Sequence, residues 1–465
     1  MRISLDQTAN VINAAIKGRV CNITRVCSYA AEIDTRQLGS GGIFFALKGT
    51  KNDGHDFLEQ AVKKRAAACV VSRKWAEKHK LDSNMCYLCV NSPKRALWQL
   101  ALFNRKLIKA KVIGVTGSNG KTTTKEIIGG ILGKGPGVLI SRGNFNNHLG
   151  VPLSLIRANT RHEYAVFEMG ANHIGEISRL SKLVRPDIGI ITCTGESHLK
   201  YFKSIKNVAK AKLEIIHGMG PGSVLVVNGD DKNLMQAVKK CRISTVTFGT
   251  NKAADDRFDD IRTDLNGVSL KMYGLRFGLN ITGRHNAYNG AAAICGARLL
   301  GLKLKDIKNR IGNIKPAAGR MEIIKKHGIT IINDRYNANP ASMQAALETL
   351  IDLKLDGRRI GVLGDMLELG SKAREIHEKI GRLHTRGLDR LFVFGNHARE
   401  IWRGALRSGF SKIYGAHFNN VHVLIFRLGC TVQSGDIVLV KGSRGMRMEL
   451  IVNGFLDLIK VKRNK

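Results

Sequence analysis

A glycine turn between a buried strand and a helix is the feature that most limits how this chain can fold. Residues 111–117 (KVIGVTG) form an apolar run typical of a buried strand, and residues 121–133 (KTTTKEIIGGILG) follow with a helical pattern. Gly117 and Gly120 permit a tight turn whose backbone N–H groups face one point, and the following helix N-terminus favours negative charge there. Strand, glycine turn and helix in this order predict a phosphate-binding loop. A chance glycine turn that ends in a solvated lysine is the alternative interpretation.

Side chains in and after the turn suit a nucleoside triphosphate. Lys121 is long enough to reach the β- and γ-phosphates, and the hydroxyl of Thr122 or Thr123 can hold Mg²⁺. The strict phosphate-loop pattern fails at one place, because Val115 occupies its first glycine position. The candidate ATP-binding residues of the loop are Thr116, Gly117, Ser118, Asn119, Gly120, Lys121, Thr122 and Thr123.

Strands and helices alternate along the chain in three blocks. Residues 1–108 mix both, with strands expected in 41–49 and 68–73 and a helix between them. Residues 109–314 and 315–465 each alternate strands with helical segments, the pattern of a parallel sheet covered on both faces. We therefore predict an α/β chain of three domains: an N-terminal mixed α/β domain, a central parallel-sheet domain with the phosphate loop, and a C-terminal doubly wound, Rossmann-like domain.

The chain carries a strong positive charge that is spread along its length. Its 465 residues include 75 Lys and Arg against 37 Asp and Glu, a formal net charge of +38. A nucleic-acid partner would need clustered cations that release phosphate counterions, and no single arm or helix collects them here. A surplus of this kind can also attract anionic substrates, or reflect a proteome that is basic throughout. Nucleic-acid binding is therefore disfavoured as the main role.

Cysteine usage and hydropathy favour a cytoplasmic enzyme. The nine cysteines are odd in number and scattered, which argues against a disulfide framework. Cys86 and Cys89 form one C-x-x-C, but the stretch is apolar and no second pair follows, so buried strand thiols are favoured over zinc or redox chemistry. No apolar run reaches the ~18–20 residues of a membrane helix, and the start lacks the features of a secretory signal. We expect no membrane insertion.

Several segments resemble one family in the same order. The motif VTGSNGKTTTKE (115–126) resembles the ATP loop of the Mur ligases and their folylpolyglutamate synthetase relatives. The later matching segments are SRGNFNNHLGVPLSL, VFEMGANHIGEI, SHLKYFKSIKNVAKAKLEI, GRHNAYN and GRMEIIKKHGITIINDRYNANP. The resemblance spans nearly the whole chain and implies that ATP activates a carboxylate as an acyl phosphate, which an incoming amine then attacks.

The resemblance also assigns site residues that the sequence alone would not. On the residues alone, Glu168 would be a solvated acid at a strand end, His198 a loop residue and Lys212 an exposed helix lysine. In the matching places, the family has ligands of two magnesium ions, with the lysine carbamylated by carbon dioxide. The implied metal ligands are therefore Thr122, Glu168, His198 and Lys212 as its carbamate. The implied catalytic residues are Lys121, Glu168, His198, Lys212 and Arg320.

The remaining candidate nucleotide contacts lie beyond the loop. His285, Asn286 and Asn289 are spaced so that a helix start can present them to adenine. Arg320 follows a glycine and is implied to contact the γ-phosphate, and Asp334 follows an apolar strand and suits a ribose hydroxyl.

The third block decides between two members of the family. Its segments DRYNANP, GDMLELG and KGSRG resemble the member that adds D-alanyl-D-alanine to UDP-N-acetylmuramoyl-tripeptide (UDP-MurNAc-tripeptide). Residues 33–57 resemble a uridine-sugar domain that this member shares with the one adding the third residue, Lys or diaminopimelate, which stays an alternative. A basic nucleic-acid-binding protein on a retired ligase scaffold is an alternative of another class. The implied substrate contacts are Thr35, Arg36, Asn144, Asn146, Asn147, Asn337 and Asn339. We expect a monomer.

Four residues depart from the family pattern. Cys193 stands where the family usually has asparagine, and Glu196 is unusual before His198. Asn333 replaces an acid and Arg335 a small residue. We expect these changes to alter rate or affinity without touching residues with core roles.

Overall fold

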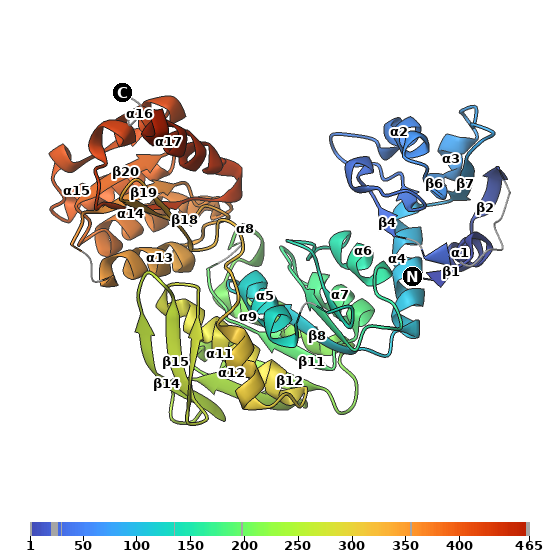
Figure 1. Ribbon diagram of the computed structural model, residues 1–465, viewed down its shortest axis with the longest axis horizontal. Helices are drawn as coiled ribbons and strands as arrows, with labels where there is room; N and C mark the ends of the chain where they lie inside the picture. Colours follow the sequence, from blue (N-terminus) through green and yellow to red (C-terminus); the bar gives the residue numbers. More distant parts are fainter. Residues whose placement is uncertain are drawn as a thin grey trace.

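The computed structural model describes residues 2–19, 27–28, 30–133, 135–196, 199–353 and 356–461. It contains three α/β parts, which follow one another along the chain. Their sheets have five, nine and six strands. In Figure 1 the blue N-terminal part and the red C-terminal part lie on opposite sides of the green and yellow central part. The three-domain α/β class predicted from the sequence is confirmed. The boundaries near residues 108 and 314 stay predictions.

The first part is a five-stranded sheet in the order β2-β7-β6-β5-β4, parallel except for the β2–β7 pair. Its expected strands are β5 and β6, but the helix between them is short, because Arg65 adopts a left-handed conformation (φ 55°) soon after its end. Cys86 and Cys89 are buried thiols of β7. The elements are β1 (Arg2–Ile3), α1 (Leu5–Ile12), β2 (Ala15–Gly18), β3 (Cys27–Ser28), β4 (Ala31–Glu32), β5 (Ile43–Phe45), α2 (Leu58–Lys63), β6 (Ala68–Ser72), α3 (Arg73–Ala76), β7 (Cys86–Val90) and α4 (Pro93–Leu107).

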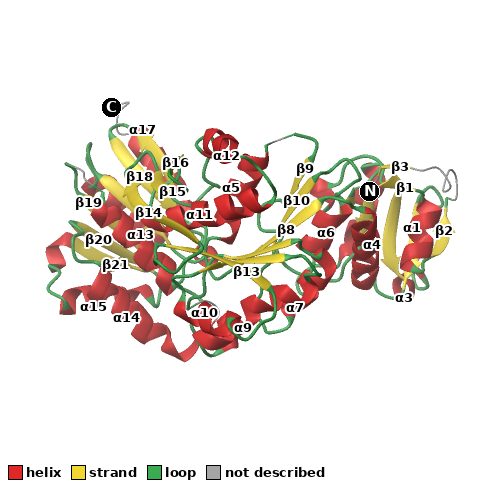
Figure 2. Ribbon diagram, turned by 90° about the horizontal axis from the view of Figure 1, so that it is seen from below, coloured by secondary structure: helices red, strands yellow, loops and turns green. Residues whose placement is uncertain are grey.

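The central part is a nine-stranded sheet in the order β16-β15-β14-β13-β12-β11-β8-β10-β9. Strands β8 to β14 pair in parallel, and β14, β15 and β16 form an antiparallel ribbon at one edge. Figure 2 shows α5, α11 and α12 on one face of the sheet and α7, α9 and α10 on the other.

The strands of this central sheet are β8 (Lys111–Thr116), β9 (Val138–Ile140), β10 (Tyr164–Glu168), β11 (Ile188–Ile191), β12 (Val224–Asn228), β13 (Ser244–Gly249), β14 (Asp256–Thr263), β15 (Val268–Met272) and β16 (Leu275–Leu279). The helices are α5 (Lys121–Leu132), α6 (Gly150–Ile156), α7 (Glu176–Val184), α8 (Leu199–Phe202), α9 (Ile205–Leu213), α10 (Lys232–Val238), α11 (Arg284–Leu299) and α12 (Leu304–Ile311).

The third part is a six-stranded sheet in the order β17-β18-β22-β19-β20-β21, parallel except for the β17–β18 hairpin. Its strands are β17 (Glu322–Lys326), β18 (Ile329–Asp334), β19 (Arg359–Gly364), β20 (Arg390–Phe394), β21 (Gly415–Phe418) and β22 (Ile437–Lys441). Its helices are α13 (Pro340–Asp352), α14 (Ala373–His384), α15 (Ala398–Arg407), α16 (Val421–Thr431) and α17 (Glu449–Val461).

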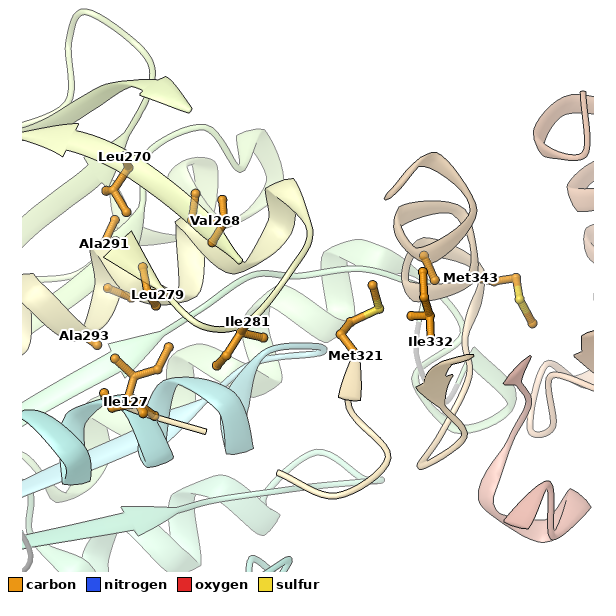
Figure 3. Packing of buried hydrophobic residues seen from close by; sticks show 14 of the residues in the cluster. Ile127, Val268, Leu270, Leu279, Ile281, Ala291, Ala293, Met321, Ile332 and Met343 are labelled. Atoms are coloured by element: carbon orange, nitrogen blue, oxygen red, sulfur yellow. The ribbon is translucent and has the colours of Figure 1, made fainter. Parts of the chain in front are cut away.

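One apolar core continues from the central part into the third. A single cluster of buried residues includes Ile127 and Ile281 from the central part and Met321, Ile332 and Met343 from the third. In Figure 3, Met321 lies between Ile281 and the pair Ile332 and Met343. The third part is therefore held against the central part by apolar packing. No helix among the described residues is both long and apolar enough to cross a membrane.

Candidate active site

Three neighbouring strands of the central sheet end at the same place. Strand β8 lies between β10 and β11, so the chain leaves β8 where the strand order changes direction, the position at which open α/β sheets bind ligands. The phosphate loop follows β8, Glu168 is the last residue of β10, and Cys193 follows β11. The parallel register therefore brings the phosphate loop, Glu168 and Cys193 together from three separate segments of the chain.

The loop needs its two glycines because other side chains fill the space beside them. Gly117 (φ 146°) leaves a Cβ position only 2.0 Å from Thr192 Oγ1, and Gly120 (φ 80°) leaves one 2.1 Å from Asn289 Oδ1. Thr192 Oγ1 donates a hydrogen bond to the Asn119 carbonyl (2.5 Å), and the Ser118 N–H donates to the Cys193 carbonyl (2.9 Å). The loop is thus fixed on both sides.

Lys121 folds back over its own loop. Its Nζ donates to the carbonyls of Gly117 (2.7 Å) and Ser118 (3.2 Å), and burial lowers its pKa from the ordinary value. The ammonium therefore lies over the turn where the loop faces the cavity, as a phosphate-binding lysine must.

Glu168 is buried and held on both carboxylate oxygens. Thr122 Oγ1 donates to its Oε2 (2.7 Å), and Asn146 Nδ2 donates to its Oε1 (2.7 Å). Arg320, from the third part, donates to the same Thr122 hydroxyl (3.0 Å). A hydroxyl and a carboxylate oxygen at this separation are the hard donors that Mg²⁺ prefers, so this pair fits a magnesium ion beside the phosphate loop.

Lys212 is almost fully buried in α9, contrary to an ordinary surface lysine. Its Nζ lies 5.5 Å from the centre of the Phe202 ring. Burial first, and then the nearby Lys121 charge, lower its pKa from 10.5 to about 7. His198, the other implied ligand, lies outside the described residues. Within the described ranges, no group of three or more His, Cys, Asp or Glu side chains is arranged to hold a metal ion.

The start of α11 forms a small polar network beside the loop. Asn289 Nδ2 donates to Asn286 Oδ1 (2.8 Å), and Asn286 Nδ2 donates to the Thr282 carbonyl (2.7 Å). His285 Nδ1 is buried without a hydrogen-bond partner, and burial lowers the pKa of this histidine to about 4. A neutral imidazole with a free buried nitrogen at the cavity wall fits a nucleobase, which can supply the missing partner.

The third part contributes two contacts to the loop. The guanidinium of Arg320 stacks 4.0 Å from the centre of the Tyr336 ring, which orients it towards Thr122. The amides of Asn119 and Asn339 donate to each other, over 3.2 and 2.8 Å. The same Asn339 caps α13 by accepting from the Ser342 N–H (2.9 Å).

Asp334 is held by an ion pair that the sequence does not predict. Lys441, at the end of β22 and 2% exposed, donates to Asp334 Oδ2 (2.5 Å) and to the Asn337 carbonyl (3.0 Å). The only sign of this contact in the sequence is that Lys441 ends an apolar strand. Two further residues at the site were not predicted from the sequence. They are Tyr336, which stacks on Arg320, and Lys125, whose Nζ lies 3.9 Å from Glu168 Oε2.

One cavity of about 1000 Å³ collects most of the predicted residues. Its walls come from all three parts, from Lys94 and Trp98 of α4 to Lys441 of β22. The predicted residues in its lining are Ser118, Asn119, Gly120, Lys121, Thr122, Thr123, Asn144, Asn146, Asn147, Glu168, His285, Asn286, Asn289, Arg320, Asp334, Asn337 and Asn339.

Of the predicted residues that the structure describes, five lie outside this lining. Thr116, Gly117 and Lys212 are next to it in the loop and in α9. Thr35 and Arg36 are in the first part, where Thr35 donates to Gln60 Oε1 (2.8 Å) and Arg36 pairs with Asp34 (2.7 Å). The structure therefore does not bring Thr35 and Arg36 to the phosphate loop.

One of the four departures lies against the phosphate loop. Cys193 contacts a residue of the loop, because its Sγ lies 3.7 Å from the Asn119 carbonyl. The reason is the parallel register, which sets the end of β11 beside the turn after β8. In the third part, Asn333 donates to Glu322 (2.8 Å) and Arg335 pairs with Glu449 (3.7 Å). Glu196 is half-buried.

Three family models match successive parts of the chain. They are the Mur ligase family catalytic domain (residues 29–97), the Mur ligase middle domain (115–297) and the Mur ligase glutamate ligase domain (319–444). Together they cover all three parts of the fold.

Relatives similar over almost their whole length carry one name. The UDP-N-acetylmuramoyl-tripeptide--D-alanyl-D-alanine ligase of Bacillus subtilis is 36% identical over 97% of this chain and 99% of its own length, and that of Escherichia coli is 33% identical over 98% of both. The crystal structure of MurF from Acinetobacter baumannii has a TM-score of 0.84 at 30% identity, covering 98% of this chain and 99% of that one. MurF from Thermotoga maritima in complex with ADP has a TM-score of 0.79 at 28% identity over 94% and 99%. With such relatives over nearly its full length, this chain belongs to the Mur ligase family.

Proposed function

We propose that this chain is an ATP-dependent ligase that joins D-alanyl-D-alanine to UDP-MurNAc-tripeptide. One observation carries the proposal: Arg320 and Asn339 of the third part reach Thr122 and Asn119 of the phosphate loop, so that nucleotide and acceptor would meet in one cavity. Full-length relatives named for this reaction support the choice of substrates. The products are UDP-MurNAc-pentapeptide for peptidoglycan synthesis, ADP and phosphate.

The reaction needs a carboxylate made reactive towards an amine. A carboxylate oxygen of the tripeptide attacks the γ-phosphorus of ATP, the bond to ADP breaks, and an acyl phosphate forms. The amine of D-alanyl-D-alanine then attacks the acyl carbon, phosphate leaves with the bonding electron pair, and the amine loses a proton to solvent. Lys121 and Arg320 lie where their positive charges stabilise the transferring phosphoryl group.

Magnesium would be held mainly by oxygen donors of the central part. We assign Thr122 and Glu168 as ligands, and Asn146 orients the carboxylate by donating to its second oxygen. When bound, the ion supplies positive charge beside the phosphates. His198 and Lys212 are further proposed ligands, giving two sites.

Lys212 is proposed to act as a carbamate. Its side chain is buried, and burial disfavours the charged ammonium there. Reaction of the neutral amine with carbon dioxide gives an anion with oxygen donors, the type of ligand that magnesium accepts. The lowered pKa supplies the neutral amine near neutral pH.

The peptide nucleotide would extend from the cavity towards the first part. Asn144 and Asn147 line the cavity near Trp98, whose Nε1 donates to the His148 carbonyl (2.7 Å). Thr35 and Arg36 are proposed to hold the uridine diphosphate, since an exposed arginine suits a phosphate. On the acceptor side, Asn337 and Asn339 lie at the start of α13. We also propose that the chain acts in the cytoplasm as a monomer, in which residues of all three parts line the cavity.

The decisive experiment measures orthophosphate release by the purified protein. We expect release only when ATP, magnesium, UDP-MurNAc-tripeptide and D-alanyl-D-alanine are all present. If Lys or diaminopimelate with the dipeptide nucleotide supports faster release, the chain is instead the ligase that adds the third residue. Binding of DNA that persists at high salt and prefers one sequence would favour the nucleic-acid alternative.

A further inference from the structure

Lys125 is a fully buried cation that has no part in the mechanism above. It lies one helical turn after Lys121 on α5, with a side chain that is 0% exposed, and it does not line the cavity. Buried lysines are rare unless their charge is paired and their donors are used. Its environment therefore indicates a specific task.

The ammonium donates two hydrogen bonds to backbone carbonyls and lies beside two carboxylates. Nζ donates to the carbonyls of Ser141 and Gly143, each over 2.8 Å, and lies 3.0 Å from Glu126 Oε1. It also lies 3.9 Å from Oε2 of Glu168. One side chain thus joins α5, the segment after β9 and the carboxylate at the end of β10.

The residues held by Lys125 lead directly into the cavity wall. Ser141 donates from its N–H to the Val166 carbonyl (2.9 Å) and accepts the Glu168 N–H at its hydroxyl (3.1 Å). The segment then carries Asn144, Asn146 and Asn147 into the cavity, and Asn146 donates to Glu168. Lys125 therefore fixes the start of the asparagine segment and the strand end that bears Glu168.

We propose that Lys125 is a positioning residue that sets the affinity of this site for a divalent cation by holding Ser141, Gly143 and Glu168 in place. This inference rests on the proposed function for the presence of the cation. Electrostatics and positioning have opposite consequences, which makes them separable. Removing a positive charge 3.9 Å from Glu168 would by itself strengthen cation binding, whereas losing the two carbonyl contacts would release the segment and weaken it.

The test is Lys125→Met, which keeps the length and apolar stem of the side chain and removes its three donors. Calorimetry measures ADP binding without metal and Mn²⁺ binding in the presence of ADP. We expect the affinity for ADP alone to stay within about twofold, because Lys125 does not line the cavity at the phosphate loop. We expect the affinity for Mn²⁺ to fall roughly tenfold or more. Unchanged or tighter Mn²⁺ binding overturns the proposal.

Two variants keep this test decisive. Asn104→Leu is the matched control, because Asn104 is also buried and donates to backbone carbonyls away from the cavity, those of Leu155 (2.7 Å), Ile156 (3.4 Å) and Ala158 (2.9 Å). It should lower thermal stability and leave Mn²⁺ binding unchanged; an equal loss in both variants means general destabilisation and overturns the inference.

If Lys125→Met does not bind ADP, Lys125→Arg decides. Its planar fork cannot repeat three tetrahedral donors, so Mn²⁺ should bind at least about threefold more weakly than in the native protein, and native affinity overturns the inference. Failure of the native protein to bind Mn²⁺ with ADP counts against the proposed function itself.

Discussion

Burial acts in the same way on two basic residues near the loop, but their neutral forms serve different roles. Lys212 and His285 both have lowered pKa values, and the first cause in each is loss of water. For His285 the neutral form is the usable one, because this residue lines the cavity and its buried Nδ1 has no hydrogen-bond partner among the described residues. For Lys212 the neutral amine is a form that can react further. The same physical effect therefore supports a passive role in one residue and a chemical one in the other.

Lys212→Ala should lose activity roughly 100-fold or more while the protein stays folded, because the proposed metal ligand is lost. Steady-state phosphate release at saturating ATP and magnesium measures this, with thermal unfolding as the check on folding. Lys212→Arg should fail as well, since its guanidinium cannot form a carbamate. Formate should partly restore the Ala variant and not the Arg variant. Lys210→Ala is the control, because Lys210 is exposed on the same helix α9; equal activity of both alanine variants would sink the carbamate hypothesis.

His285 should make the protein less stable as the pH falls. Its pKa is about 4 in the folded chain against about 6.5 when unfolded, so between these values the unfolded chain takes up a proton that the folded chain refuses. The stability contribution is fully present above pH 6.5 and is lost towards pH 4. Urea unfolding from pH 7 to 4.5 should show the native protein losing about 2–3 kcal/mol relative to His285→Gln. A difference between the two that does not vary with pH would contradict this.

At the level of elements, the turn between β8 and α5 is the most demanding in geometry. Gly120→Ala should weaken ADP binding by about tenfold or more, because the left-handed backbone strains and the new Cβ would meet Asn289 2.1 Å away. Calorimetric titration with ADP measures the loss. Gly133→Ala separates strain from collision, since Gly133 also has a positive φ (98°) but nothing lies within 4 Å of its Cβ position. It should cost stability and leave ADP binding intact, and comparable losses of ADP affinity would refute the argument.

Buried strands and the phosphate loop are the features that the sequence predicts best. Apolar runs such as 111–117 can only be buried strands in an alternating chain, so the parallel sheets and the loop follow from periodicity. The roles of Lys125 and Lys441 could not be predicted, because a lysine on a helix or at a strand end is usually solvated, and only long-range pairing shows what buries it. The early end of α2 was not predicted either, because it depends on the left-handed backbone conformation of Arg65. The site residues His198, Thr35 and Arg36 keep the roles implied by the family resemblance as predictions.

At the scale of the whole molecule, two kinds of contact hold the third part against the loop. The polar contacts are the amide pair Asn119–Asn339 and the bond from Arg320 to Thr122. The apolar contact is the continuous core in which Met321 is 2% exposed. Side-chain hydrogen bonds contribute about 0.5–1.5 kcal/mol each, whereas fully burying one methionine contributes about 1.5–3 kcal/mol. The apolar contact should therefore set the domain arrangement, and the polar contacts should adjust it.

Met321→Ala and Asn119→Ala test this order of effects. Met321→Ala should lower the free energy of unfolding by about 2–5 kcal/mol and increase the radius of gyration in small-angle scattering without ligand, because the wedge between Ile281 and Ile332 is lost. Asn119→Ala should cost about 1 kcal/mol and leave the radius unchanged, since the apolar core still holds the third part in place. Asn144→Ala, a cavity asparagine with no hydrogen bond to the third part among the described residues, should change neither quantity. If Asn119→Ala opened the molecule as far as Met321→Ala, the amide pair rather than the core would govern how the parts of this ligase meet.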